Sequence, residues 1–405
     1  MIFDITISNF GSIRNQLKIA SLLHREMRIS NRGFRRTGLG NGPLGPSRLM
    51  VMVGENETGK TTILSALQCL HSLATGKRDV EPQADYIRLF NGENCSFRLN
   101  FWSGKTPYCY SIGFRDGLVM KEELFNRPNR RPTLLYRRTR FDGGESELAF
   151  GNSLQLSPAE KEVLSAIPSD NQTVLSAYST LNFHKPALET AWRYFSTQFC
   201  ATTTVDDFTI TAGEFIGIYP ELMGKLMEMS KKGIRLDREI IDNLHALGQT
   251  AARCRRAGLE AKLFRESMAH FLHTLSSGMS EFIRTLVTLM VCVRNQSVCT
   301  IDDFGDKMDT NKACAVLDYF LSQETCSQLF LSTHSSLLLD YGQLRREQVV
   351  FLYRDADGHI SADQKLAKSI HKSISLANAF NRGLRPDSGN INTNNEDTQS
   401  IDNLE

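Results

Sequence analysis

The sequence lacks the cysteine spacing that indicates a metal site or a disulfide scaffold. Its nine cysteines include no C-x-x-C pair. A secretory signal is missing as well, because residues 1–7, MIFDITI, alternate like a strand and show no basic, apolar and cleavage regions. We therefore expect reduced, mostly buried thiols in a cytoplasmic protein.

Long apolar runs and an excess of one charge are also missing. The longest apolar candidate, residues 282–293, is too short to span a membrane and contains Arg284. The net charge is only +2, with 47 Lys and Arg against 45 Asp and Glu. Composition therefore predicts no membrane partner and, by itself, no nucleic-acid binding. We see no internal repeat and no long heptad pattern, which argues against an extended coiled coil.

Hydrophobic periodicity predicts an α/β fold with an additional sheet. Alternation in residues 1–9 and 16–22 predicts a hairpin, and short alternating runs between residues 86 and 141 predict an antiparallel sheet. Residues 158–280 repeat apolar positions at intervals of three and four, as helices do. Three buried strands of an α/β core are predicted from apolar runs at residues 298–301, 328–332 and 348–353.

A chain of 405 residues is long enough for a main domain with an insertion. We predict the following division: an N-terminal lobe at residues 1–157, a helical insertion at 158–274, a C-terminal lobe at 275–383 and a disordered tail at 384–405. Residues 28–48, rich in glycine and arginine, are predicted to form a loop.

One short stretch carries specific chemistry. Residues 54–61, GENETGKT, match G-x-x-x-x-G-K-[ST] at every fixed position. The apolar run 48–53 precedes the match, and residues 62–70, TILSALQCL, follow with helical spacing. Strand, glycine loop and helix is the context that this phosphate-binding motif requires. The competing interpretation is a glycine-rich turn before an ordinary helix.

The residue types in this stretch suit a nucleoside triphosphate. Gly54 and Gly59 let backbone N–H groups point inward at phosphate oxygens, and the start of the helix adds its positive end. Lys60 would reach the β- and γ-phosphates, and the Thr61 hydroxyl would ligate Mg²⁺. The binding residues predicted in and beside the loop also include Asn56, Thr58 and Thr62.

Three further motifs follow in the second half of the chain. Residues 275–279, LSSGM, precede a helical stretch; Asp302 and Asp303 follow the strand 298–301; and His334 follows the strand 329–332. Each has an ordinary structural interpretation when taken alone, since paired aspartates after a strand commonly form a helix cap or a turn. Their occurrence in this order after a phosphate loop favours an ATP site.

These motifs resemble those of ABC-class ATPases. LSSGM resembles the LSGGQ signature, VCTIDDF resembles the acidic strand end, Asp309 aligns with the last aspartate of the D-loop, and STHS resembles the histidine switch. A closer resemblance, covering most of residues 1–380, is to stand-alone ATP-binding proteins related to RecF and SMC heads. It includes ITISNFGSI near the N-terminus and VVFLYRDADGHI after the histidine.

The resemblance implies a fold and a mechanism. The fold would be an ABC-type P-loop ATPase head, with a mixed core sheet, an antiparallel β-subdomain and a helical insertion. Two chains would form a homodimer or a larger homo-oligomer, in which Ser277 and Gly278 of one chain contact the ATP of the other. Asp302 would hold Mg²⁺, Asp303 would orient the attacking water, and His334 would contact the γ-phosphate.

One departure from the family pattern concerns the rate. The family usually has glutamate where this chain has Asp303, so the carboxylate is shorter by roughly 1.5 Å, and such a displacement can cost about 100-fold in rate. We therefore expect slow ATP hydrolysis.

The biological role is open among three hypotheses. The first is a bacterial antiphage ATPase that senses an invader and controls a separate effector protein. The second is a RecF-like DNA repair ATPase, with DNA contacted by arginine clusters at residues 127–140 and 253–256. The third is the motor of a transporter, which the long span between Lys60 and Gly278 argues against. We favour the first, with DNA repair as the alternative.

Overall fold

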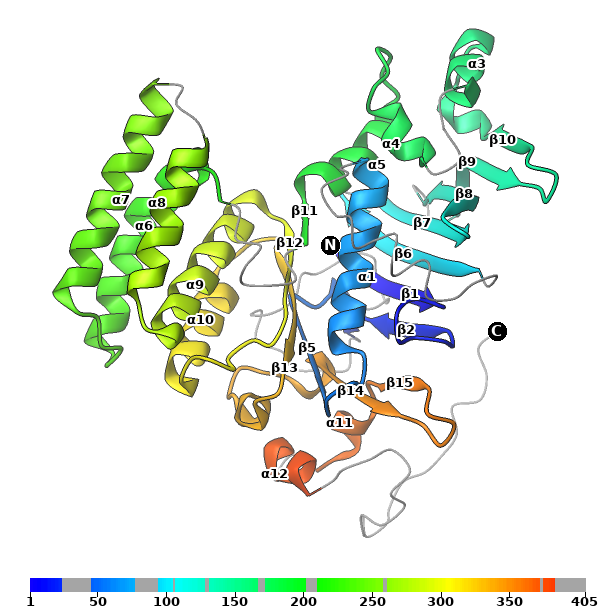
Figure 1. The fold of residues 1–405 in the computed structure, drawn as a ribbon. Coiled ribbons are helices and arrows are strands. Elements are labelled where there is room, and N and C mark those ends of the chain that lie inside the picture. Colours follow the sequence, from blue (N-terminus) through cyan, green and yellow to red (C-terminus); the bar gives the residue numbers. More distant parts are fainter. Residues whose placement is uncertain are drawn as a thin grey trace.

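The computed structural model describes residues 1–23, 45–76, 94–104, 106–127, 131–166, 172–201, 210–257, 261–371 and 374–382 (Figure 1). Most of the loop predicted at residues 28–48 and all of the tail predicted at 384–405 lie outside the described residues. The cysteines with described side chains form no disulfide, and all but Cys314 and Cys326 are buried. In the described part of the chain, no helix has the length and apolar character needed to cross a membrane.

An antiparallel sheet forms one layer, with strand order β10-β9-β8-β7-β6-β1-β2. Its long central strands alternate buried and more exposed residues, because one face packs on the core and the other faces outward. The strands are β1 Ile2–Ser8, β2 Leu17–Ala20, β6 Cys95–Ser103, β7 Thr106–Arg115, β8 Leu118–Asn126, β9 Thr133–Arg140 and β10 Ser146–Phe150. The N-terminal hairpin and the antiparallel sheet are both found where the sequence predicts them.

A second, mixed sheet forms the core, with strand order β11-β12-β13-β5-β14-β15. Neighbouring strands are parallel except for β15, which is antiparallel to β14. Strands β5 and β13 are buried along their whole length, as expected for strands covered on both faces. The strands are β5 Leu49–Gly54, β11 Phe199–Ala201, β12 Val298–Ile301, β13 Gln328–Thr333, β14 Val349–Arg354 and β15 Ile360–Asp363. Two short strands, β3 Leu22–Leu23 and β4 Gly45–Pro46, form a separate two-stranded sheet.

Two hydrophobic cores cover the two faces of the mixed sheet. Met50 and Met52 of β5 face the core that contains α1 and the antiparallel sheet, whereas Val51 and Val53 face the core that contains α6 to α10. Helix α1 therefore lies between the two sheets (Figure 1). The alternation of side chains along a strand produces this arrangement.

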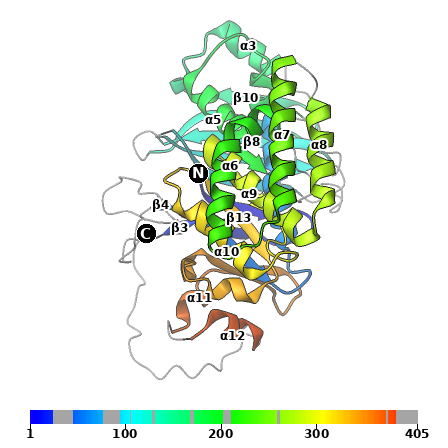
Figure 2. The ribbon, with the colours of Figure 1, turned by 90° about the vertical axis from the view of Figure 1, so that its left-hand side faces the viewer.

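The helices divide between these cores. Helices α4 Val174–Tyr178 and α5 Pro186–Thr197 contribute to the core with α1 Lys60–Thr75, and α3 Pro158–Ala166 packs beside α4. On the other face lie α6 Ala212–Lys231, α7 Arg238–Ala257, α8 Ala261–Thr274, α9 Ser277–Asn295 and α10 Thr310–Ser322. Figure 2 shows α6, α7 and α8 side by side on this face. Short helices α11 Leu366–Ser369 and α12 Leu376–Asn381 follow β15.

The fold class predicted from the sequence, α/β with a mixed core sheet and a separate antiparallel sheet, is confirmed. The predicted domain bounds stay a prediction.

Candidate functional site

A cavity of about 470 Å³ opens where the parallel strands of the core sheet end. Strand β5 ends at Gly54, β12 at Ile301, β13 at Thr333 and β14 at Arg354. Parallel strands end at one edge of a sheet, so segments far apart in the sequence meet there. The cavity is lined by Ser12, Asn56, Glu57, Gly59, Lys60, Thr61, Thr62, Asp303, His334 and Arg354.

The predicted phosphate loop, residues 54–60, connects β5 to α1, and its two glycines are required by its geometry. A Cβ atom on Gly54 would lie 2.5 Å from the Leu352 carbonyl oxygen and 2.5 Å from Thr58 Oγ1. Gly59 caps α1 with a φ of 86°, where L side chains are disfavoured. The loop therefore wraps tightly from the strand into the start of the helix.

Lys60 points back into this loop. Its side chain is buried, and Nζ donates hydrogen bonds to the carbonyl oxygens of Gly54 at 2.9 Å and Glu55 at 2.8 Å. Burial lowers the pKa of Lys60, and the nearby carboxylates of Asp303 and Asp302 oppose that shift. The ammonium is thus held inside the loop and on the wall of the cavity.

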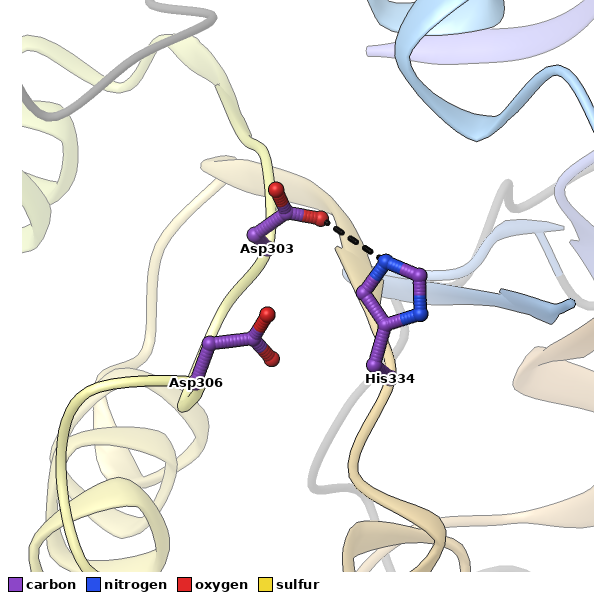
Figure 3. A group of neighbouring side chains, drawn as sticks. All are labelled: Asp303, Asp306 and His334. Carbon is purple, nitrogen blue, oxygen red and sulfur yellow. Dashed lines mark ion pairs between the residues drawn. The ribbon is translucent and has the colours of Figure 1, made fainter. Parts of the chain in front are cut away.

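The two aspartates after β12 have different surroundings. The carboxylate of Asp302 accepts a hydrogen bond from the Ser332 hydroxyl, and that hydroxyl oxygen accepts the backbone N–H of Asp303 at 2.9 Å. Asp303 Oδ1 lies 3.3 Å from His334 Nε2. Figure 3 shows Asp303 and Asp306 from the same loop turned toward His334. Neighbouring strand ends thus carry the acidic groups and the imidazole together.

The charge around Asp303 is unbalanced toward the acidic side. Partial burial raises the pKa of its carboxyl above the ordinary 3.8, and the like charges of Asp302 and Asp306 raise it further. His334 and Lys60 act in the opposite direction. A carboxylate poised in this way can accept a proton or a hydrogen bond from water, which suits hydrolytic chemistry.

The site offers a set of oxygen donors for a divalent cation. Thr61 lies on the cavity wall at the first turn of α1, and the carboxylates of Asp302, Asp303 and Asp306 follow β12. Ligand atoms of Asp303, Asp306 and His334 all lie within 4.8 Å of one another. Hydroxyl and carboxylate oxygens are hard ligands of the kind that Mg²⁺ prefers, so the residues present fit that ion.

Five predicted site residues do not line the cavity: Gly54, Thr58, Asp302, Ser277 and Gly278. Gly54, Thr58 and Asp302 belong to segments that border it, whereas Ser277 and Gly278 lie on a different element. Ser277 and Gly278 begin α9, and the side chain of Ser276 caps the helix by accepting the N–H of Met279. Ser277 is exposed, and Gly278 packs closely against the backbone of Lys307. Neither lines the cavity that contains Lys60.

Two predicted residues have structural contacts. Thr58 is buried, and its hydroxyl donates to the Glu55 carbonyl oxygen at 2.8 Å, within the loop rather than toward the cavity. Asp309 caps α10 by accepting the N–H of Lys312 at 3.0 Å. Both side chains therefore stabilise the local backbone.

Four residues at the site were not predicted: Ser12, Glu57 and Arg354 line the cavity, and Asp306 lies close to Asp303 and His334. Ser12 Oγ lies 2.8 Å from Thr62 Oγ1, Asp306 faces the cluster of Asp303 and His334, and Arg354 donates to the Glu57 carbonyl oxygen at 2.9 Å. Arg354 ends β14, so the rule that singled out Asp302 and His334, a polar residue at the end of a buried strand, would have found it.

The predicted arginine cluster of residues 127–140 is only partly a basic surface. Arg138 is buried and donates to the Gln172 carbonyl oxygen at 2.7 Å, and Arg137 is paired with Glu123 at 2.5 Å. The second cluster is different: Arg253, Arg255 and Arg256 are exposed near the end of α7.

Comparisons with known proteins give only distant likenesses. No protein-family model and no curated protein matches the chain. An SMC head bound to the C-terminal winged-helix domain of ScpA matches with a TM-score of 0.39 and 11% identity, over 89% of this chain and 96% of that one. The SMC head domain from Thermotoga maritima matches with a TM-score of 0.36 and 11% identity, over 89% and 98%.

A third likeness is to an SMC head domain with an extended coiled coil, bound to the C-terminal domain of ScpA from Pyrococcus furiosus. Its TM-score is 0.32 and its identity 13%, over 89% of this chain and 95% of that one. At such low TM-scores and identities, these likenesses support no conclusion about function.

Proposed function

We propose that this chain binds ATP with Mg²⁺ at the phosphate-loop cavity and hydrolyses the nucleotide slowly. The observation that carries the proposal is the position of Lys60, whose ammonium is held by the Gly54 and Glu55 carbonyls beside Asp303 and His334. Neutral carbonyls bind an ammonium less strongly than phosphate oxygens do, so a triphosphate can take their place.

Each residue has a role in this proposal. Backbone N–H groups of the loop and the start of α1 bind the phosphates, and Lys60 contacts the β- and γ-phosphates. Thr61 and Asp302 would hold Mg²⁺, which supplies positive charge against the phosphate oxygens. Asp303 orients the attacking water and accepts its proton, and His334 contacts the γ-phosphate.

The slow rate that we propose is supported by the length and the contacts of Asp303. Its carboxylate is a methylene shorter than a glutamate, and one oxygen lies 3.3 Å from His334 Nε2. The carboxylate must therefore serve the imidazole and the water at once. Slow turnover suits a protein that switches between states rather than one that does continuous work.

Self-association is the next part of the proposal. Ser277 and Gly278 lie at a helix N-terminus outside their own chain's cavity, and such a terminus is a suitable site for anions. In a homodimer or larger homo-oligomer they would contact the γ-phosphate bound by another chain.

The finer biological role rests on the resemblance of the sequence motifs. We propose that ATP-dependent assembly controls a separate effector protein in bacterial antiphage defence. Isolation of the native complex from its host would test this role, because a stable second protein is expected there. The alternative is a RecF-like DNA repair ATPase, for which the exposed Arg253, Arg255 and Arg256 are the residues to substitute in a DNA-binding assay.

Substitution of Lys60 tests ATP binding. We expect Lys60→Ala to weaken ATP binding more than tenfold in equilibrium titration, because the cation nearest the phosphates is lost. Lys225→Ala is the matched control, since Lys225 is also partly buried and pairs with Glu228 on α6, away from the cavity. Unchanged ATP affinity in folded Lys60→Ala would contradict the site assignment.

A further inference from the structure

A buried carboxylate on α9 holds the loop that carries the acidic residues of the site. Glu281 is 4% exposed and accepts two backbone hydrogen bonds, from Gly305 N–H at 3.3 Å and Lys307 N–H at 2.9 Å. It does not line the cavity. The loop that it contacts, residues 302–309, begins with the site aspartates and ends at the cap of α10. Glu281 thus anchors the middle of this loop.

The loop needs such an anchor because part of its backbone is in a disfavoured conformation. Asp303 has a φ of 48° and Gly305 a φ of 87°. A left-handed conformation is disfavoured for L residues, although aspartate tolerates it better than most and glycine adopts it freely. Phe304 N–H donates to the Ser332 carbonyl oxygen at 2.8 Å, which fixes one side of the loop. Glu281 fixes the other side.

Helix α9 contacts the same loop one turn earlier. A Cβ atom on Gly278 would lie 2.6 Å from the Lys307 carbonyl oxygen, so the helix and the loop backbone are in close contact there. Positions three apart lie on one face of a helix, and Gly278 and Glu281 are such a pair. The N-terminal turns of α9 and the loop 302–309 therefore form one packed unit.

We propose that Glu281 is a positioning residue for hydrolysis: through the Gly305 and Lys307 amides it holds Asp303 in the conformation that places its carboxylate beside His334. This inference rests on the proposed ATPase function. Nucleotide binding is assigned to a different segment: Lys60 Nζ bonds to the Gly54 and Glu55 carbonyl oxygens, whereas Glu281 accepts from Gly305 and Lys307. Loss of the Glu281 contacts should therefore affect turnover much more than binding.

The experiment compares Glu281→Gln with the wild type in the full chain. The amide keeps the size of the side chain but offers one acceptor oxygen in place of two, so one loop N–H loses its partner. We expect kcat to fall at least tenfold, since a displacement of about 1 Å at a reacting group can cost about 100-fold. The Kd for ATP should stay within twofold. Rates are expressed per nucleotide-binding site, counted by titration with a fluorescent ATP analogue.

Glu122→Gln is the matched control. Glu122 is also buried, and its carboxylate accepts the backbone N–H groups of Val174 at 2.7 Å and Leu175 at 3.4 Å, outside the site. Both variants should lower the melting temperature, but only Glu281→Gln should lower kcat per site. A general loss of folded protein would instead reduce the number of sites and leave kcat per site unchanged.

The outcomes separate this inference from the ATPase proposal. Equal kcat per site in wild type and Glu281→Gln overturns the positioning role, and so does an equal loss in Glu122→Gln. If the wild type binds no ATP, the proposed ATPase function itself is wrong. Should Glu281→Gln not fold, Glu281→Asp provides the test: its carboxylate is retained but set back by one methylene, so kcat per site should fall while Kd is kept, and an unchanged kcat overturns the proposal.

Discussion

Replacing Asp303 by asparagine separates the chemistry of its side chain from the conformation of its backbone. The residue has a φ of 48°, in the left-handed region that aspartate and asparagine adopt more readily than other non-glycine residues. Asp303→Asn should therefore keep the loop, whereas Asp303→Ala should lose about 1 kcal/mol of stability at the same φ. The asparagine variant changes charge and basicity with little change in shape.

The charges around Asp303 determine how Asp303→Asn changes stability and ATP affinity. Burial and the like charges of Asp302 and Asp306 disfavour its carboxylate, while His334 and Lys60 favour it. Removing the charge relieves the repulsion from the two aspartates but also removes the attraction to His334 and Lys60. Because these effects oppose each other, we expect the unfolding free energy of Asp303→Asn to lie within about 0.5 kcal/mol of the wild type. ATP should bind at least as tightly, because a negative charge near the γ-phosphate is gone.

Turnover is where the substitution should act. Loss of a positioned general base typically costs about 10²–10⁴-fold in rate, which corresponds to about 3–5 kcal/mol in the activation free energy. The assay measures steady-state phosphate release, ATP affinity and urea unfolding for wild type, Asp303→Asn and Asp242→Asn, a control on the exposed surface of α7. Wild-type turnover in Asp303→Asn would refute the assignment of Asp303 as the residue that orients water.

Further predictions concern other parts of the structure. Asp303→Glu should raise kcat, because the carboxylate reaches further toward the water, and phosphate release measures this. Ser277→Asp should block ATP-dependent assembly and hydrolysis, because its charge repels the γ-phosphate. If each site is shared between two chains, mixing this variant with Lys60→Ala should restore part of the ATPase activity. No recovery in proven mixed oligomers would contradict shared sites. Arg48→Met should lower the unfolding free energy by about 2–4 kcal/mol, because buried carbonyls at the end of α10, including that of Phe320 at 2.7 Å, lose their donor.

The cap of α10 gives a prediction about pH. The hydrogen bond from Lys312 holds the pKa of Asp309 below its ordinary 3.8. Because the folded-state pKa is the lower one, the stabilisation is present above 3.8 and disappears as the pH falls through the folded-state value. Asp309→Ala should cost about 1 kcal/mol at neutral pH in urea unfolding. This difference from the wild type should shrink in strong acid, and a constant difference would contradict the argument.

The sequence predicts the longer strands of the core sheet better than it predicts the short strand β11 or the packing partners of the helices. Strands β12, β13 and β14 are short, apolar and buried, so local composition is enough to find them. Strand β11, Phe199–Ala201, has three residues and offers no periodicity, and its position is set by pairing with β12. Periodicity in residues 158–274 predicts helices but not their packing partners, which differ: α5 packs near α1, and α6 packs near α9.

The candidate site shows the same division between local and long-range information. Lys60, Asp302, Asp303 and His334 are recognisable because a local pattern surrounds each of them. The role of Glu281 is invisible in the sequence, where it is one polar residue near the start of a helix. Its burial depends on a loop more than twenty positions further along the chain, which hydrogen-bonds back to it.

The order of strands in the mixed sheet has a consequence for biosynthesis. Strand β5, which leads into the phosphate loop, lies between β13 and β14, and Arg354 at the end of β14 contacts Glu57 of that loop across 297 residues of chain. A ribosome that adds about 5–20 residues per second needs roughly 15–60 s to cover this interval. For most of that time, until β13 is synthesised, the nascent loop has neither neighbouring strand. The proposed nucleotide site of a nascent chain should therefore form only after β14 has been synthesised, and a chain that terminates before β14 should remain bound to chaperones.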